Sequence, residues 1–184
     1  VRLVDPCGCL GRELPGQEDY FQSQPESPET LARPGPAVYV GCREYPWPRG
    51  WLRLRPRNLA AGVGCNKGTP AAEILALMTD VFARFRLSLR SLHCLATIAA
   101  KKSEPGLVAA AQHLGVTLVW YTAEELQEVP VPNPSAMVQR HMGVASVCEA
   151  AALKAAGGKT LLIPKQKTPN VTLAVAQVGW PWSV

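Results

Sequence analysis

The chain has 184 residues, of which 47% are hydrophobic, and its formal net charge is +5. This length suffices for one α/β domain with a smaller attached segment, and the apolar content is enough for a sizeable core. No run of about 18 apolar residues predicts a membrane span, and no basic start followed by an apolar run predicts a secretory signal. The first residue is Val1 rather than Met, so we expect the chain to derive from a longer parent protein.

The charge is unevenly distributed along the chain. Residues 1–33 carry three arginines and six acidic residues, a net charge of −3, so the remaining residues carry +8. A basic globular part indicates an anionic partner, such as a nucleic acid, a phosphate or a polycarboxylate, although charge also serves solubility alone. A nucleic-acid-binding function fits the charge but ranks last among the functions considered, because no aromatic residues alternate with a basic stripe.

The six cysteines form no C-x-x-C pair, and the Cys7-x-Cys9 spacing is too short for the usual zinc knuckle. Cys94 and Cys148 fall within apolar runs, which is typical of small core residues. The sequence therefore predicts no metal site of the protein's own. It also favours a reduced, cytoplasmic location over a secreted disulfide framework.

We interpret residues 1–58 as a middle or linker region with one or two short strands. Residues 1–36 are rich in Pro, Gly, Ser, Gln and Glu, a composition typical of a linker. Two short apolar runs, 37–40 and 51–54, predict the strands. We expect a connecting segment here rather than a complete domain.

From Leu59 onward, strand and helix patterns alternate. Thr69 is predicted to cap a helix with Pro70 at its first position. Two capping boxes, Thr122–Glu125 and Ser146–Glu149, predict further helix starts. The predicted strands are 59–63, 94–98, 116–121, 160–163 and 171–178, and the remaining predicted helices start at Pro105, which leads to Gly115, and at Asn133, which leads to Gly143.

Alternation of this kind predicts an α/β fold in which helices cover both faces of a sheet. The last two strands are joined by a polar loop and can be antiparallel. We therefore expect a three-layer α/β/α domain with a mixed, mostly parallel sheet over residues 59–178, followed by a tail at 179–184.

Three loops with lysines are predicted to leave strands at the carboxyl edge of this sheet, where open α/β sheets bind ligands. The third reaches that edge only if its strand runs parallel to the others. Two of the loops run into helix N-termini, which favour anions. The first matches neither G-x-x-x-x-G-K-[ST] nor G-x-G-x-x-G, so a mononucleotide site is not supported. The candidate binding residues are Gly64, Asn66, Lys67, Gly68 and Thr69 in the first loop, Lys101 and Lys102 in the second, and Lys165, Lys167 and Asn170 in the third.

Two residues are candidates for catalysis, each with a structural alternative. Glu104 is either a general base or an acidic residue that favours the dipole at a helix start. Cys65 lies in a glycine loop before a helix, where a thiolate is stabilised, or it is a small residue in a tight turn. Glu149 fits the acidic position of a capping box, and His93, His113 and His141 receive no role.

Six motifs in order resemble the C-terminal domain of the CbiG/CobE family, over about residues 51–178. These motifs are 62–69 (GVGCNKGT), 95–98 (LATI), 104–107 (EPGL), 131–135 (VPNPS), 146–152 (SVCEAAA) and 162–165 (LIPK). Residues 1–50 look like the more variable middle region of CbiG proteins.

The resemblance implies a role in cobalamin biosynthesis. CbiG is implied to be cobalt-precorrin-5A hydrolase, which opens a lactone on the macrocycle and releases acetaldehyde. Its substrate is a cobalt-bearing ring fringed with acetate and propionate groups, so the protein itself is expected to need no cofactor. The expected partners are this polycarboxylate corrinoid, an N-terminal domain of the parent chain and other enzymes of the corrin pathway, with no nucleic acid and no membrane.

The chain departs from the family pattern in two respects. The N-terminal domain of CbiG is absent from it, and Ala99 stands where many relatives carry an acidic residue. Two functions therefore stay open at this point. The chain is either part of the hydrolase or a CobE-like module that binds corrinoid intermediates without catalysis.

Overall fold

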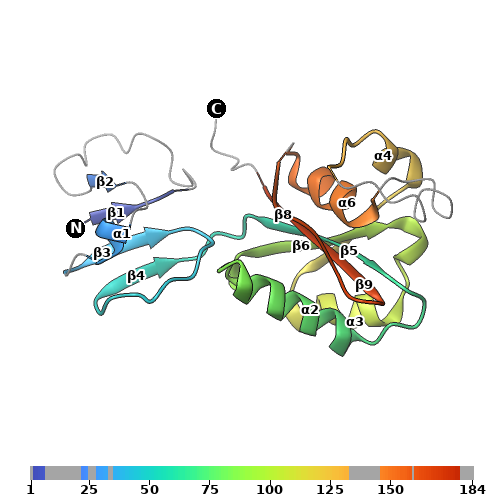
Figure 1. Cartoon of the computed structure of the whole chain (residues 1–184), viewed down its shortest axis with the longest axis horizontal. Helices are drawn as coiled ribbons and strands as arrows, with labels where there is room; N and C mark the ends of the chain where they lie inside the picture. Colours follow the sequence, from blue (N-terminus) through green and yellow to red (C-terminus); the bar gives the residue numbers. More distant parts are fainter. Residues whose placement is uncertain are drawn as a thin grey trace. The chain divides into compact units, whose positions relative to one another are not determined.

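The computed structural model of the chain describes residues 2–6, 22–24, 28–32, 35–132, 146–158 and 160–178. These residues divide between two compact units (Figure 1). The first unit lies within residues 1–57 and 86–91, and the second within 58–85 and 92–179.

The first unit contains a four-stranded, all-parallel sheet in the order β2-β1-β3-β4. Val4, Ala37, Tyr39 and Trp51 form its buried cluster, because alternate residues of three strands face the same side. The prediction of one or two strands in residues 1–58 was wrong, since the linker-like composition concealed two short strands and a helix. The elements are β1 (Arg2–Val4), β2 (Gln22–Gln24), α1 (Pro28–Ala32), β3 (Ala37–Val40) and β4 (Trp51–Leu54).

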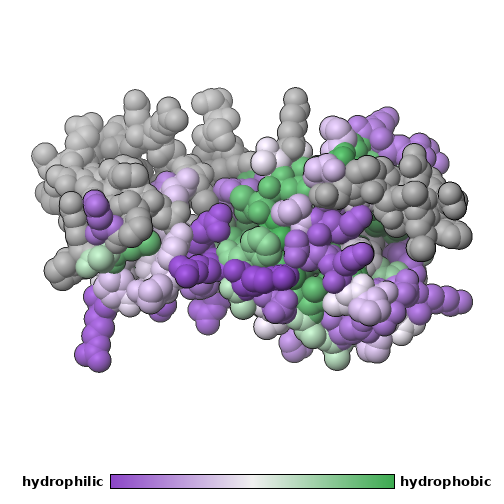
Figure 2. Space-filling view, in the orientation of Figure 1, coloured by the Kyte–Doolittle hydropathy of each residue, from purple (hydrophilic) through white to green (hydrophobic). Residues whose placement is uncertain are grey.

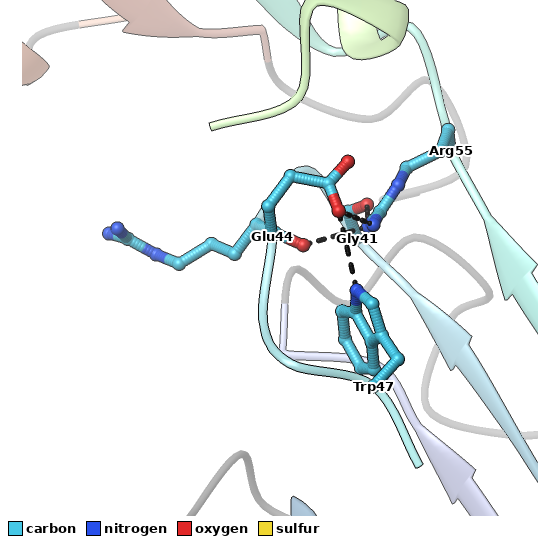
Figure 3. Close-up of polar contacts among 5 residues, drawn as sticks. Gly41, Glu44, Trp47 and Arg55 are labelled. Carbon is cyan, nitrogen blue, oxygen red and sulfur yellow. Dashed lines mark hydrogen bonds and ion pairs between the residues drawn. The ribbon is translucent and has the colours of Figure 1, made fainter. Parts of the chain in front are cut away.

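Arg55 fixes the connection between β3 and β4 (Figure 3). Its guanidinium donates to the backbone oxygens of Gly41 and Arg43 at 2.9 and 2.8 Å and to a carboxylate oxygen of Glu44 at 2.7 Å. The same group lies 5.4 Å from the ring centroid of Trp47. One planar cation therefore satisfies two loop carbonyls and covers the edge of the aromatic core.

The second unit contains a five-stranded sheet in the order β7-β6-β5-β9-β8. β5, β6 and β7 are parallel, and β9 is antiparallel to both β5 and β8. This arrangement confirms the predicted mixed, mostly parallel sheet. The strands are β5 (Leu59–Cys65), β6 (Leu92–Ile98), β7 (Thr117–Tyr121), β8 (Leu161–Lys167) and β9 (Val171–Gln177).

Helices cover both faces of this sheet, as predicted (Figure 1). α6 packs directly on β5, and a Cβ atom at Gly62 would lie 1.8 Å from the backbone oxygen of Cys148. Only a residue without a side chain allows this approach. The helices are α2 (Ala71–Arg84), α3 (Pro105–Leu114), α4 (Ala123–Gln127) and α6 (Val147–Ala156), with 3₁₀ turns η1 (Leu89–Ser91) and η2 (Ala99–Lys101).

Three local predictions need correction. The capping box Thr122–Glu125 is present, but Ser146 makes no side-chain cap at α6. α2 starts one residue later than predicted, because the Thr69 hydroxyl donates to the Asn66 backbone oxygen instead of capping the helix. β8 extends four residues beyond the predicted strand and turns part of the predicted third loop into a strand. The predicted helix at Asn133 lies outside the described residues, as do Cys7, Cys9 and His141.

The two units differ in their basic residues. The second unit has nine Lys or Arg and seven Asp or Glu, a formal net charge of +2, and it contains all seven lysines of the chain. The predicted basic character of the globular part is therefore carried largely by arginines of the first unit. In the described part of the chain, no helix is long and apolar enough to cross a membrane.

Candidate ligand-binding site at the carboxyl edge of the sheet

The carboxyl ends of β5 and β8 meet at one edge of the sheet. Cys65, the last residue of β5, pairs with Val171 at the start of β9, and Lys167 at the end of β8 pairs with the next residue, Thr172. β8 therefore runs in the same direction as β5, which is the condition that the sequence had left open for the third loop. The turn at residues 168–170 lies beside the loop that follows β5.

Two asparagines join these loops. The Asn66 backbone N–H donates to the Asn170 backbone oxygen at 2.9 Å, and the Asn66 side-chain amide donates to Asn170 Oδ1 at 3.0 Å. The Asn170 amide in turn donates to Glu73 Oε2 at 3.3 Å, at the start of α2. Both asparagines were predicted to bind ligand, and the structure gives them a role in fixing the edge.

Glu104 joins the loop after β5 to the loop after β6. Its Oε1 accepts a hydrogen bond from the Gly68 backbone N–H at 2.6 Å, and its Oε2 lies 3.6 Å from Lys101 Nζ. Both side chains of this ion pair are nearly buried. Glu104 occupies the N-cap position of α3 but forms no side-chain cap there. The geometry is that of a clamp between two loops, and a general base would first have to release one of these contacts.

The start of α3 lies very close to the same loop. A Cβ atom at Gly106 would lie 2.0 Å from the Thr69 backbone oxygen. Gly68 has a φ of +75°, a conformation that favours glycine, and Thr69 is buried. A Cβ atom at Gly64 would lie 2.7 Å from Thr172 Oγ1. Of the predicted binding residues, Gly64 is therefore required by packing and Gly68 by backbone conformation, and Thr69 is buried, so each has a structural role apart from a ligand.

The Cys65 thiol is not activated in this structure. Its pKa is raised, because burial disfavours the thiolate and the Glu104 charge adds to that effect, while Lys101 opposes it. The expectation of a stabilised thiolate in this loop was wrong. Burial alone raises the pKa of Cys94 to about 11, in agreement with its predicted place in the core.

The predicted lysines separate into two groups. Lys67, Lys102 and Lys167 are exposed, whereas Lys101 is held by Glu104. Lys165 lies within β8 rather than in a loop, and its backbone N–H donates to Glu149 Oε1 at 2.9 Å. Glu149 is fully buried and its carboxylate accepts this bond from the edge strand, while the predicted capping box is incomplete because Ser146 forms no side-chain cap.

Figure 2 shows hydrophilic residues on the right of the second unit and a darker hydrophilic band near the middle of the view, so the hydrophilic surface is not confined to this edge. Among the residues that the structure describes, no group of three or more His, Cys, Asp and Glu could hold a metal ion. His93 and His113 are exposed, and neither was assigned a role.

Three residues near this edge were missed by sequence reasoning. Glu73 and Thr172 contact the loops, and Trp120 on β7 lies next to Lys102. Thr172 carried no signal, because its contact with the Gly64 backbone oxygen depends on strand pairing 108 positions apart. Trp120 did carry one, since a large aromatic residue near the end of a strand in a proposed binding edge merits attention.

The comparisons with known proteins concern the second unit. Residues 59–176 match the family described as "Cobalamin synthesis G C-terminus". Cobalt-precorrin-5A hydrolase of Priestia megaterium is 40% identical over 126 residues, which cover 68% of this chain and 34% of the hydrolase. The chain thus spans about a third of the length of that relative.

Protein CobE of Sinorhizobium sp is 36% identical over 122 residues, which cover 65% of this chain and 79% of CobE. The crystal structure of CobE, a protein from the cobalamin (vitamin B12) biosynthetic pathway, has a TM-score of 0.62 and 33% identity. It covers 65% of this chain and 93% of the CobE chain.

Proposed function

The chain belongs to the cobalamin synthesis G C-terminus family, and from this premise we propose that its second unit holds a polycarboxylate corrin intermediate as part of a cobalt-precorrin-5A hydrolase. The carboxyl edge of the sheet is the proposed site. Its ligand is a cobalt-bearing macrocycle with acetate and propionate groups, so the metal arrives with the substrate.

The observation that carries this proposal is the arrangement of exposed lysines around the carboxyl edge of the sheet. We call this the braced edge, because hydrogen bonds between Asn66 and Asn170 and between Glu104 and Gly68 join its loops. Lys67 is an exposed residue of the loop after β5, and Lys167 is the exposed last residue of β8, next to the turn at 168–170. Asn66, Asn170 and Glu104 hold this loop and this turn in place. Charged side chains on fixed backbones lose less conformational entropy on binding than charges on mobile loops. Separate lysines on a wide edge suit carboxylates spread around a ring better than one compact phosphate.

We assign the catalytic step of the hydrolase to parts of the enzyme outside the matched region. Opening a lactone requires a water molecule to attack its carbonyl carbon, with a general base to accept the proton. Both oxygens of Glu104 already have partners, and the pKa of Cys65 is raised, so this edge is better suited to binding than to catalysis. We expect acetaldehyde release to need the further part of the hydrolase that the relatives have beyond the matched region.

A second candidate function is a CobE-like module that binds corrinoid intermediates without catalysis. The observation that favours it is coverage, because the region matched in sequence accounts for 79% of Protein CobE and only 34% of the hydrolase. Both candidates share the same ligand and the same edge. They differ only in whether the parent protein turns the ligand over.

Titration with dicyanocobyrinic acid, a corrin with free carboxylates, tests the shared part by its visible absorbance. Replacing Lys67 and Lys167 together by Ala is expected to weaken binding about tenfold at low salt, because each exposed charge pair contributes up to about 1 kcal/mol. Lys154→Ala, on α6, is the matched control and is expected to bind as the wild type does. Absence of binding, or equal weakening by Lys154→Ala, would overturn the proposal.

Acetaldehyde release from cobalt-precorrin-5A separates the two candidates. The parent protein is expected to release acetaldehyde, and the chain of 184 residues is expected to bind without release. If the parent protein binds the substrate and releases none, the CobE-like function replaces the hydrolase. Release by the short chain would place the catalytic groups within it, with Glu104→Gln and Cys65→Ser as the variants to compare.

A further inference from the structure

Trp120 is a large aromatic residue that is exposed on the surface of the second unit. Its relative exposure is 49%, and it is the only large hydrophobic residue exposed among the described residues of that unit. A single exposed apolar residue needs no explanation by itself. Trp120 differs from such a residue because it lies near the carboxyl edge of the sheet and contacts Lys102.

Trp120 lies on β7, the edge strand of the sheet, one residue before the strand ends. The residues on either side, Val119 and Tyr121, pack against the buried cluster formed with α6. Because successive side chains of a strand point to opposite faces, the indole lies on the face that α3 covers. It is paired with Thr97 of β6, so it lies near the carboxyl edge already described.

The loop after β6 brings a lysine over this indole. Lys102 Nζ lies 5.0 Å from the centroid of the Trp120 ring. Its neighbour Lys101 turns instead toward Glu104, and only 13% of that side chain is exposed. The two adjacent lysines therefore have different roles, and Lys102 is the one presented to solvent on an aromatic support.

We propose that Trp120 and Lys102 form a second contact for the macrocycle, beside the lysines of the braced edge. Lys102 binds one carboxylate of the ligand, and the exposed part of the indole contacts the apolar, methyl-bearing periphery of the ring. The cation–π contact holds the ammonium group in place before binding, which reduces the ordering cost of a flexible side chain. This inference rests on the proposed function and adds the residue that recognises the apolar part of the ligand.

Two probes separate the two contacts: dicyanocobyrinic acid and its heptamethyl ester, which has the same ring without the charges. Trp120→Ala is expected to weaken binding of both about tenfold, as loss of an aromatic contact does at a binding surface. Trp120→Phe retains most of the affinity. Lys102→Ala is expected to weaken binding of the acid several-fold, to reduce its salt dependence and to leave the ester unaffected.

Fluorescence gives an independent reading, because Trp120 is one of five tryptophans and the others are at 47, 51, 180 and 182. The quenching that the acid causes in the wild type is expected to fall in Trp120→Phe. Leu52→Ala is the control, since Leu52 is an exposed apolar residue on β4 of the first unit. Circular dichroism checks that each variant is folded, and Lys102→Ala provides a surface variant if Trp120→Ala is not.

The outcomes distinguish failure of the proposed function from failure of this inference. If the wild type binds neither probe, the proposed function and this inference both fail. If the wild type binds and the Lys67 and Lys167 double variant binds less, but Trp120→Ala and Lys102→Ala bind normally, the inference alone is overturned. Equal weakening by Leu52→Ala would also overturn it.

Discussion

In both units of the chain, a charged side chain forms hydrogen bonds with backbone groups, but the charges are opposite. In the first unit, the Arg55 guanidinium donates to carbonyls of the loop between β3 and β4. In the second, carboxylates of Glu104 and Glu149 accept hydrogen bonds from backbone N–H groups. Each charged group supports irregular backbone where no ladder of hydrogen bonds is possible.

Their cores differ as well. The first unit relies on an aromatic cluster, in which the ring centroids of Tyr39 and Trp47 are 4.4 Å apart. The second relies on small residues, such as Gly62 and Ala152, that let α6 lie directly on the sheet. The aromatic core is filled by large side chains, with the guanidinium groups of Arg2 and Arg55 against the rings, whereas close helix–sheet packing has no spare volume. Substitutions should therefore affect the two units in different ways.

The largest expected effect is at Gly62. In Gly62→Ala, the added methyl group meets backbone atoms of Cys148 and Ala152 that cannot move without shifting α6. We expect the free energy of unfolding of the second unit to fall by about 3 kcal/mol or more, at the upper end of overpacking effects. Urea denaturation followed by circular dichroism measures this change.

Gly115→Ala is the matched control. Gly115 has a φ of +64° with open space around its Cβ position, so the same methyl group costs only backbone strain of about 1 kcal/mol. If both variants lose equal stability, close packing of α6 on β5 is not what requires Gly62.

The next effect is at Arg55. Arg55→Met keeps much of the apolar stem and leaves the carbonyls of Gly41 and Arg43 without this donor, at a cost of about 1–3 kcal/mol to the first unit. Trp47 and Trp51 report unfolding of this unit through their fluorescence. Arg55→Lys is expected to recover little, because an ammonium group cannot reproduce the planar fork. Full recovery by lysine would mean that the charge alone matters.

The smallest effect is at Glu149. The register between β8 and β9 shifts between Ile163 and Gln166, and the Lys165 N–H turns to the buried carboxylate. Glu149→Ala is expected to lower the free energy of unfolding by about 1 kcal/mol, because a partly buried donor loses its acceptor. Glu149→Gln retains an acceptor oxygen and is expected to lose less. Hydrogen exchange of the Lys165 amide measures this directly, and unchanged protection in Glu149→Ala would contradict the assignment.

Much of the second unit followed from local pattern. The apolar stripe of α2, the capping box at Thr122 and the glycine after α3 are signals within a few residues, and each marked an element that the structure contains. The first unit was harder, because its strands are only three or four residues long and pair with segments far along the chain. Short strands carry little periodicity, so a composition rich in Pro and Gly outweighed them.

The candidate site was likewise predicted only in part from the sequence. Sequence placed the loops and their lysines near one edge, but it could not say which side chains face a ligand. Glu149 and Glu104 illustrate why, because their partners at Lys165 and Gly68 lie 16 and 36 positions away. A motif fixes residue type and spacing, and it cannot specify which of two acceptors a side chain will reach.

The sequence by itself determined the family, the alternation of strands and helices, and the lysine-bearing loops, since all of these depend on residue order. Only the tertiary structure decided that β8 runs parallel to β5, that Lys101 is held by Glu104, and that Lys102 lies over Trp120. The physical reason is that strand direction and side-chain partnership are set by contacts between distant segments. Such contacts form only when the chain is packed.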